Sequence, residues 1–431
     1  MTIWEIFKKL FKRKVVKNAT WIISGRVIHM ICAFFVSLLT ARYLGPGNYG
    51  LINYATAYTT FFYSICTLGL NSILVKVLID EPSMEGETIG TGLVLQGIAS
   101  FSSSLMIIGI ACLIDGKEPL SVIVTALCTI GLFFRIFELL HCWFQAHLLS
   151  KYTAITSTIA YLITSLYRLI LLIRGANVKW FALATAIDYL IVAVFLIAFY
   201  VKCGGKHFSF SFTKAKKLLK MGTPFILAGL MVSIYGNTDK MMLKQMLSES
   251  SVGYYSTAVS LCNVWVFVLS AIIESMYPVI MESKKQSIEK YEKQNRMLYA
   301  IVFYVSVAVS LLFVIFGKPV VYILYGKEYL PAVAPLRVIT WYVAFSYLGV
   351  ARNAWIVSEN LQKYITPIYI GAAITNVILN LMLIPLWAET GAAIASLVTQ
   401  ISTIFVFPLF IKPMRRNTQL LAEAITLRWL K

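Results

Sequence analysis

The sequence is poor in charge and contains no long polar region. Charged residues make up 13% of the 431 residues, against roughly 25% in a typical soluble domain. Acidic residues are especially scarce, with 19 Asp and Glu against 38 Lys and Arg. Such a chain has too few polar residues to cover a soluble fold and no extended polar face for nucleic acid. The net charge of +19 therefore indicates contact with an anionic membrane surface.

Cysteine pairs and catalytic motifs are also missing. The seven cysteines are scattered, nearly all along apolar segments, without a Cys-x-x-Cys pair, and are interpreted as small packing residues rather than disulfides or metal ligands. The four histidines are isolated, and no Gly-rich phosphate loop or nucleophile arrangement is present. These absences predict a protein that is not an enzyme and that uses no catalytic residues, metal or cofactor.

Apolar stretches long enough to cross a membrane fill most of the chain. A spanning helix needs about 20 mostly apolar residues, because the hydrocarbon core is about 30 Å thick. The sequence matches this template at 19–41, 50–72, 89–114, 120–145, 152–173, 179–201, 223–247, 252–276, 297–317, 332–357, 362–386 and 390–411. We therefore predict an all-α membrane protein with about twelve transmembrane helices.

Lysine and arginine are divided unevenly between the two sides of this arrangement. With both termini inside, 25 of the 38 basic residues fall in inner segments and six in outer loops. Because basic residues concentrate in cytoplasmic loops, we expect a multi-pass protein of the cytoplasmic membrane with both termini in the cytoplasm. The inner loop 73–88 departs from this pattern, since it holds four acids beside Lys76.

A polar inner segment with six lysines divides the chain into two halves. We expect an amphipathic interfacial helix at 1–18, a six-helix bundle at 19–201, a basic cytoplasmic linker at 202–221, a second six-helix bundle at 222–412 and a basic cytoplasmic tail at 413–431. Each half contains a helix with an intramembrane charge, a tight turn and a Gly-led helix, reading GLINYATA at 50 and GYYSTAVS at 253. This weak repeat is typical of transporters and predicts two bundles around a central cavity.

Ionisable residues inside the predicted spans are the candidate functional residues, because each is costly in lipid unless it faces water or a partner. Seven cations stand against four acids in these spans. The cations are Arg26, Arg135, Arg168, Lys240, Lys244, Arg337 and Arg352, and the acids are Glu138, Asp188, Asp239 and Glu274. A cleft with this excess favours an anionic substrate, and phosphate is the obvious candidate.

Four of these cations are substrate-binding candidates. Arg26 and Lys240 lead, because we expect them at corresponding positions of the two halves, well inside the bilayer. The helix that holds Lys240 is further loosened by glycine and proline, as substrate-lining helices tend to be. Arg337 and Arg352 complete the set, with snorkelling at helix ends as an equally good explanation of both.

Three acids are candidates for coupling transport to protons or sodium, namely Glu138, Asp188 and Asp239. For Glu138 the competing explanation is a structural ion pair with Arg135, three residues earlier on the same helix. The membrane potential acting on a charged cargo is a third source of energy, and the sequence does not choose among them.

Four segments carry a resemblance to a known family. They are ARYLGPGNYGLINYATA at 41–57, NTDKMML at 237–243 followed by VGYYSTAVSL at 252–261, LYGKEYLPAVAPLRV at 324–338, and ETGAAIASLVTQ at 389–400. In order and spacing they resemble the Wzx-type oligosaccharide flippases, which move O-antigen and polysaccharide units, in the multidrug/oligosaccharidyl-lipid/polysaccharide exporter superfamily. The resemblance implies two bundles of helices around a cationic cavity, with Arg26 and the Asp239/Lys240 pair as the favoured cavity residues.

The resemblance also implies a function and its partners. A polyprenyl-pyrophosphate-linked oligosaccharide would move from the inner to the outer leaflet by alternating access, for cell-surface polysaccharide synthesis. The expected partners are this lipid-linked glycan, membrane lipids, a proton or sodium ion, and other polysaccharide-assembly proteins, without nucleic acid.

Three other classes are weighed against this prediction. An ion-coupled multidrug or cation exporter of the same superfamily is the main alternative, although its cleft would more naturally be acidic. A membrane glycosyltransferase or polymerase typically places acids in large outer loops, whereas the longest outer loop here, 317–331, holds only Glu328 as an acid. A purely structural scaffold predicts no charges in the middle of the bilayer.

Overall fold

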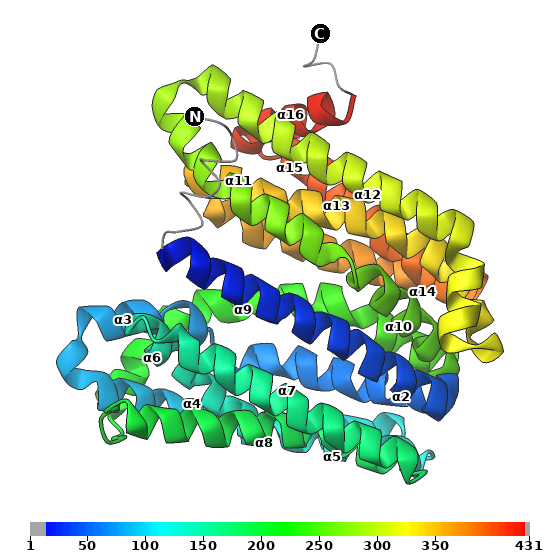
Figure 1. The fold of residues 1–431 in the computed structure, drawn as a ribbon, viewed down its shortest axis with the longest axis horizontal. Helices are drawn as coiled ribbons and strands as arrows, with labels where there is room; N and C mark the ends of the chain where they lie inside the picture. The colour runs from blue at the N-terminus through cyan, green and yellow to red at the C-terminus, as the bar shows by residue number, and fades with distance from the viewer. Residues whose placement is uncertain (1–13, 427–431) are drawn as a thin grey trace.

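The chain is helical throughout the part that the structure describes (Figure 1). This computed structural model describes the backbone of residues 14–426 and the side chains of residues 33–426 other than residue 228. Most of the interfacial helix predicted at 1–18, and the last residues of the predicted tail, lie outside the described residues.

The first half of the chain runs from α2 to α8. Its elements are α2 (Lys14–Cys66), η1 (Leu70–Ser72), α3 (Leu74–Asp80), η2 (Pro82–Met84), α4 (Glu85–Ile114), α5 (Pro119–Arg135), η3 (Ile136–Leu139), α6 (Leu140–Ala146), α7 (Ser150–Ile173) and α8 (Val178–Lys202). α2 contains two predicted spans, because Gly45 adopts a left-handed φ of 70° and Pro46 starts a new helix. The span predicted at 120–145 is built from α5, η3 and α6.

The second half of the chain runs from α9 to α16. Its elements are α9 (Phe212–Met246), α10 (Glu249–Asn263), α11 (Val266–Gln286), α12 (Ile288–Tyr325), η4 (Lys327–Ala332), α13 (Val333–Ser358), η5 (Gln362–Tyr364), α14 (Ile365–Ile401), the π-helical turn η6 (Ser402–Val406), α15 (Phe407–Leu409), η7 (Lys412–Met414) and α16 (Arg415–Thr426). α10 and the start of α11 form the span predicted at 252–276. α14 contains parts of two spans, because its backbone leaves the helical region at Trp387 and Ala388, just after Pro385.

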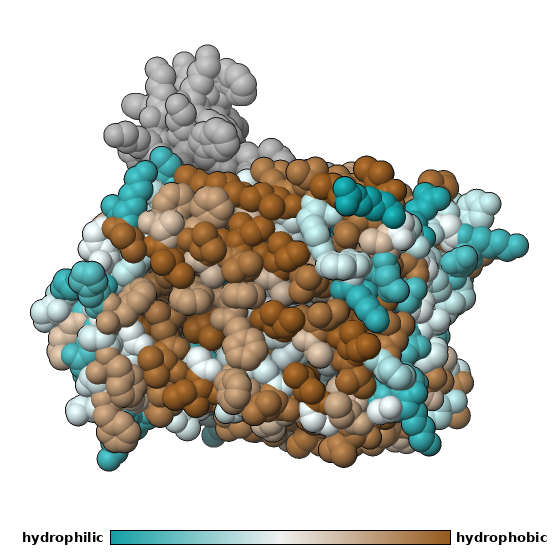
Figure 2. All heavy atoms as spheres, turned by 90° about the horizontal axis from the view of Figure 1, so that it is seen from below, coloured by the Kyte–Doolittle hydropathy of each residue, from teal (hydrophilic) through white to brown (hydrophobic). Residues whose placement is uncertain are grey.

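All twelve predicted spans are therefore found as helices. Nine helical segments within the described residues are long and apolar enough by themselves to cross a membrane. Figure 2 shows apolar side chains covering the middle of one face, with polar side chains gathered at its two ends. Large apolar residues such as Leu312 and Ile315 are exposed on the outside of the bundle. This distribution is the one that a lipid bilayer requires, so the protein is a multi-pass membrane protein.

The helices form two bundles, as the sequence predicts. In Figure 1, α3 to α8 lie in the lower bundle with the second part of α2, and α11 to α16 lie in the upper bundle. α9 and α10 lie between them. α9 packs on both α2 and α14, so it contacts both halves of the chain.

The segment between the halves is shorter than the sequence predicts. α8 ends at Lys202 and α9 begins at Phe212, so residues 203–211 are not helical, and we call them the linker. The rest of the predicted segment 202–221 is mostly the start of α9. Ser211 begins that helix by accepting a hydrogen bond from the backbone N–H of Lys214. The end of the bundle that holds the linker is called the linker end below.

Two of the four acids of the loop 73–88, Glu81 and Glu85, bind basic groups at the linker end. The carboxylate of Glu81 pairs with both Lys214 and Lys217 at the start of α9. Lys206 of the linker donates to the carbonyl oxygen of Pro82 over 2.7 Å. The carboxylate of Glu85 lies 3.1 Å from His147 Nε2. Glu81 therefore ties α9 to the first bundle, and the carbonyl oxygen of Pro82 ties the linker to it.

The bridge formed by Glu81 has a defined pH range. Hydrogen bonds from Lys214 and Lys217 lower the pKa of Glu81 from 4.5 to about 2. A carboxyl with a depressed pKa stabilises the folded state above its unfolded pKa, and this contribution is lost as the pH falls toward about 2. The Glu81 carboxylate stays ionised throughout the roughly neutral range of pH 6 to 8. We therefore expect the resistance of Lys214 and Lys217 to trypsin to stay constant over this range.

The Glu81→Gln variant removes the charge at every pH. We expect faster tryptic cleavage at Lys214 and Lys217, because both lysines lose their ionic partner. A Glu289→Gln variant is the matched control, since Glu289 is an exposed acid at the first turn of α12. Equal cleavage rates in the Glu81→Gln variant and the unaltered protein would show that the bridge does not hold α9 on the first bundle.

Candidate functional site

Two glycines bring the halves into backbone contact at the end opposite the linker. A Cβ atom on Gly50 would lie 1.8 Å from the carbonyl oxygen of Glu249, and one on Gly253 would lie 2.1 Å from the carbonyl oxygen of Pro46. Both distances are far below van der Waals contact, so only glycine fits at either position. The contact is reciprocal, because each glycine receives the first turn of the other helix. The two Gly-led helices of the sequence repeat therefore meet each other.

This contact sets the register of the internal repeat. Pairing Gly50 with Gly253 shifts one half onto the other by 203 residues. In that register Arg26 corresponds to Gly229, and Lys240 corresponds to Ser37. The expectation that Arg26 and Lys240 occupy corresponding positions is therefore wrong by eleven residues, or about three helical turns.

Polar side chains seal the same end next to the glycines. Asp115, which is 3% exposed, accepts hydrogen bonds from Tyr54 Oη at 3.0 Å and from Gln245 Nε2 at 3.1 Å. Lys244 pairs with Glu118, and its Nζ lies 3.6 Å from Asp115 Oδ1. Tyr54, Asp115 and Glu118 belong to the first half of the chain, and Lys244 and Gln245 belong to α9. We call these five residues the end network.

The end network was missed by the sequence analysis, which counted Lys244 only as an intramembrane cation. The available signal was the loop DGKE at 115–118, which places two acids beside long apolar stretches. A pocket of about 520 Å³ opens near this network and is lined by Leu44, Gly45, Pro46, Gly47, Asn48, Leu51, Glu118, Leu120, Ser121 and Glu249. Its two carboxylates both pair with Lys244, and none of the lining residues is a cation, so this pocket offers no positive group to a phosphate.

Lys240 lies on the side of α9 that faces the first half of the chain. Lys240 follows Ser233 by seven residues and precedes Lys244 by four, so the three residues lie on one face of the helix. Ser233 is hydrogen-bonded to Ser64 of α2, and Lys244 reaches Glu118, so this face is the one between the halves. Lys240 is half-buried between these two contacts. Among the described side chains, no carboxylate oxygen lies within 4.0 Å of its Nζ.

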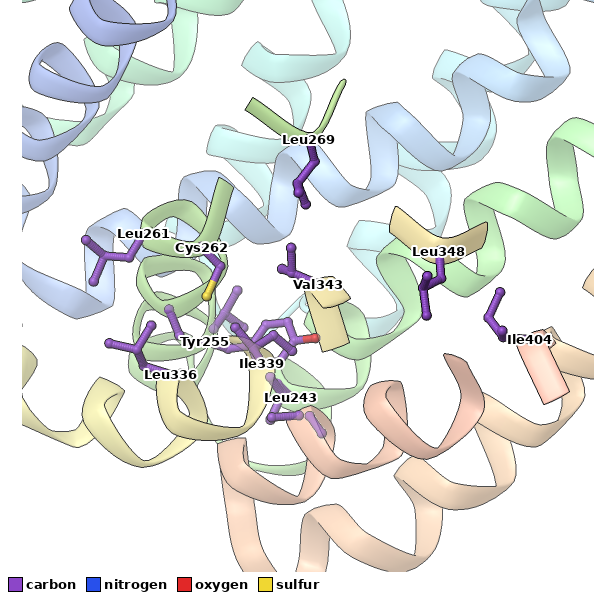
Figure 3. Packing of buried hydrophobic residues seen from close by; sticks show 14 of the residues in the cluster. Leu243, Tyr255, Leu261, Cys262, Leu269, Leu336, Ile339, Val343, Leu348 and Ile404 are labelled. Carbon is purple, nitrogen blue, oxygen red and sulfur yellow. The ribbon is translucent and has the colours of Figure 1, made fainter. Parts of the chain in front are cut away.

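The preceding residue points into the second bundle instead. The carboxylate of Asp239 accepts hydrogen bonds from Tyr255 Oη at 2.5 Å, Ser396 Oγ at 2.5 Å and Asn380 Nδ2 at 2.7 Å. Figure 3 shows Tyr255 among the apolar side chains where α9, α10 and α13 pack. Asp239 and Lys240, expected as a pair, therefore have separate surroundings, one among polar donors in the second bundle and one between the halves.

Unpaired polar atoms surround the Asp239 carboxylate. Asn376 Oδ1 accepts from Asn380 Nδ2 over 3.1 Å. Asn376 Nδ2, Asn380 Oδ1 and Thr399 Oγ1 are buried and have no hydrogen-bond partner within the described residues. Unpaired buried polar atoms are costly, and two of these, Asn380 Oδ1 and Thr399 Oγ1, are oxygens that can accept from a donor or coordinate a small cation, whereas Asn376 Nδ2 is a donor.

Arg135 and Glu138 form the structural ion pair that the sequence left open. Arg135 Nε lies 3.0 Å from Glu138 Oε2, which also accepts from Tyr63 Oη at 2.7 Å. The Arg135 guanidinium stacks over the ring of Tyr63, with its Cζ 3.4 Å from the ring centroid. The pair occupies the junction of α5 and η3, where the helix tightens into 3₁₀ geometry.

Three other predicted site residues, Arg337, Arg352 and Asp188, belong to helices other than α9. Arg337 is exposed one turn inside the start of α13. Arg352 is 5% exposed and donates from Nη1 to the carbonyl oxygen of Thr403 over 3.1 Å, in the π-helical turn. Asp188 of α8 accepts from Thr164 Oγ1 at 3.0 Å. Arg26 belongs to α2, but its side chain lies outside the described residues.

Relatives cover nearly the whole chain. The capsular polysaccharide biosynthesis protein CapF of Staphylococcus aureus is 19% identical over 402 residues, covering 92% of this chain and 99% of CapF. The lipid II flippase MurJ, in an inward closed conformation, superposes with a TM-score of 0.77 at 13% identity, covering 95% of this chain and 92% of MurJ. A multidrug resistance MATE family transporter of the MOP superfamily, in its inward-facing conformation, gives a TM-score of 0.67 at 15% identity, covering 90% and 96%.

These similarities fix the fold and the family. The two solved structures share the fold of this chain, and their identities are too low to carry over a substrate. The family model of polysaccharide biosynthesis proteins matches residues 15–284, which is more than half of the chain. The chain is therefore a membrane protein with a flippase and transporter fold, and it belongs to the polysaccharide biosynthesis protein family.

Proposed function

We propose that the protein moves a polyprenyl-pyrophosphate-linked oligosaccharide from the inner to the outer leaflet of the cytoplasmic membrane, for cell-surface polysaccharide synthesis. The observation that carries this proposal is Lys240, a cation between the two halves whose Nζ has no carboxylate oxygen within 4.0 Å among the described side chains. An unneutralised ammonium group at membrane depth is costly unless an anionic cargo or water reaches it. A pyrophosphate headgroup supplies two phosphates with which this lysine can pair.

We infer the side of cargo entry from the end opposite the linker, which the glycine contact and the end network close. Within the described residues, almost every hydrogen bond or ion pair between the two halves is made by α9. The exception is the bond from Tyr329 Oη to the Ala41 carbonyl oxygen, which lies at the end opposite the linker. We infer that the linker end faces the cytoplasm, with both termini there, because the basic segments gather at that end. The cargo then enters from the cytoplasmic side and leaves when the end network separates.

Arg26 remains a proposed second substrate cation on α2. Arg337 and Arg352 are better explained as an interfacial residue and a buried partner of the Thr403 carbonyl group, respectively. We infer that Asp239 is the coupling carboxylate, rather than Glu138, which is neutralised by Arg135, or Asp188. The support for Asp239 is the set of unpaired polar atoms around it.

The Asp239→Asn variant tests the coupling role. Because an amide cannot release a proton or neutralise a sodium ion, we expect transport to become independent of imposed sodium and pH gradients. The rate should fall by about tenfold or more, the effect of losing one charged interaction of about 1.5 kcal/mol. The measurement is transport into proteoliposomes under each gradient separately, with Glu274→Gln as the control. Retained gradient dependence in the Asp239→Asn variant would move the coupling role elsewhere.

Reconstitution separates this function from the main alternative, an ion-coupled multidrug or cation exporter, which the MATE-like fold favours. Proteoliposomes would contain a fluorescent polyprenyl-pyrophosphate oligosaccharide, or a cationic dye in a parallel sample. We expect the labelled glycolipid to become accessible to a membrane-impermeant quencher on the far side, and the dye to stay in place. Movement of the dye without the glycolipid would establish the exporter instead.

A further inference from the structure

The linker and the first residue of α9 carry a row of exposed aromatic side chains. Phe208, Phe210 and Phe212 are 43%, 53% and 79% exposed. They alternate with Ser209 and Ser211 in a stretch that is not helical before residue 212. Ser211 has extended backbone dihedrals, and alternate residues of an extended segment share one face, so we treat the three phenylalanines as a single apolar row.

The path of this row is fixed by contacts with the start of α4. The backbone N–H of Ser209 donates to the Gly86 carbonyl oxygen over 3.2 Å, and that of Ser211 donates to Thr91 Oγ1 over 3.1 Å. A Cβ on Gly90 would lie 2.4 Å from the Ser209 carbonyl oxygen, so the linker backbone presses directly on this helix. A segment held this closely presents a built surface rather than a loose loop.

The linker also folds back along the last turn of α8. The ring of Phe208 stacks on that of Tyr200, with centroids 5.0 Å apart and an angle of 26° between the rings. Tyr200 Oη donates to the Lys206 carbonyl oxygen over 2.7 Å. The aromatic row therefore lies at the depth at which the spanning helix ends, which is where the headgroup layer of a bilayer lies.

Positive charge surrounds the row. Residues 202–220 contain six lysines and no acid. Glu81 of the adjoining loop pairs with Lys214 and Lys217. The same loop holds two more acids, Asp80 and Glu87, and neither has a partner among the described residues. Lys202, Lys216 and Lys220 are exposed and make no hydrogen bond or ion pair with the described residues. Apolar rings beside free ammonium groups match the acyl boundary and the phosphates of an anionic lipid layer.

We propose that the linker is a docking surface for anionic phospholipid of the leaflet at the linker end. The three phenylalanines insert at the acyl boundary, and Lys202, Lys216 and Lys220 bind the lipid phosphates. The surface is separate from the site around Lys240, and the proposal does not depend on the cargo. Because α9 starts at Phe212, the docked lipid holds the end of the helix that connects both halves.

Photocrosslinking in lipid nanodiscs tests this proposal. A photoreactive benzoylphenylalanine replaces Phe210 or Phe212 in the full chain, in nanodiscs with equal amounts of phosphatidylglycerol and phosphatidylcholine. The matched control places the same group at Phe101 of α4, a surface position that is 56% exposed, against 53% for Phe210. Mass spectrometry of the adducts gives the ratio of the two lipids at each position.

We expect phosphatidylglycerol adducts at positions 210 and 212 to exceed phosphatidylcholine adducts by about threefold, as the attraction of several lysines for anionic lipid predicts. Adducts at Phe101 should follow the bulk composition. The Lys202→Gln, Lys216→Gln, Lys220→Gln triple variant should reduce the ratio at position 210 to the bulk value. Equal adduct ratios at all positions, no lipid adducts at 210 and 212, or adducts mainly to another protein in cell membranes would overturn the proposal.

Discussion

The Gly50→Ala variant is expected to lose about a hundredfold in transport while still inserting into the membrane. The added Cβ lies 1.8 Å from the Glu249 carbonyl oxygen, and a backbone oxygen cannot move aside as a flexible side chain can. Overpacking of this kind costs about 3 kcal/mol, which corresponds to about a hundredfold change in a population. This overpacking energy destabilises the state in which the end opposite the linker is closed. The transport cycle therefore stalls with that end open.

The Gly253→Ala variant should behave in the same way, because its Cβ meets the Pro46 carbonyl oxygen. Gly97→Ala is the control, since no heavy atom lies within 4 Å of a Cβ placed there. Closure itself can be followed with cysteines at positions 47 and 250, because a Cβ on Gly47 lies 3.6 Å from Ser250 Oγ. Gly50→Ala should suppress their disulfide. A disulfide yield unchanged by Gly50→Ala would show that the glycines do not control this end.

The helical spans could be predicted from the sequence because lipid imposes one dominant requirement. Every backbone polar group must be paired within the helix, and the side chains must be apolar to face lipid. A span is therefore recognisable as about 20 consecutive, mostly apolar residues. What the hydropathy pattern could not show was the breaks within spans. The 3₁₀ turn after Arg135 lies inside the span predicted at 120–145 and depends on packing with neighbouring helices, which leaves no periodic signal. The break at Trp387 and Ala388 instead falls between the spans predicted at 362–386 and 390–411. Gly45 and Pro46 likewise lie between the spans predicted at 19–41 and 50–72, and glycine permits the left-handed φ at this turn.

The candidate site was predicted as a set of charges but not as an arrangement. Sequence identified Lys240 and Asp239 as intramembrane charges, and adjacent residues on a helix were expected to act as a pair. They lie about 100° apart around the helix axis, so one faces the first half of the chain and the other faces α10 and α14. The hydrogen bonds from Asn380 and Ser396 come from residues more than 140 positions away. Only the folded chain shows that Asp239 is satisfied by donors and Lys240 is not.

Replacing Lys240 with Ala is expected to slow glycolipid translocation by at least about tenfold, whereas Lys240→Arg retains more of it. The alanine variant removes the unpaired cation from the face of α9 that meets the first bundle, and with it the charge that binds the anionic headgroup. Loss of a hydrogen bond to a charged group costs about 1.5 to 3 kcal/mol, so the rate should fall by about tenfold to more than a hundredfold. The measurement is flipping of the fluorescent glycolipid in proteoliposomes, with Lys285→Ala, an exposed lysine of α11, as the control.

The stability of the Lys240→Ala variant distinguishes a cargo site from a structural lysine. A lysine that contributed to packing or to an internal ion pair would destabilise the protein when removed. Lys240 instead pays the cost of a half-buried charge without a carboxylate partner in the described structure. Its removal should therefore leave the melting temperature unchanged or raise it by a few degrees, about the shift produced by 1 kcal/mol in a chain of this size. Lower transport together with higher stability is the signature of a charge retained for its ligand, and a variant that transports normally would remove Lys240 from the site.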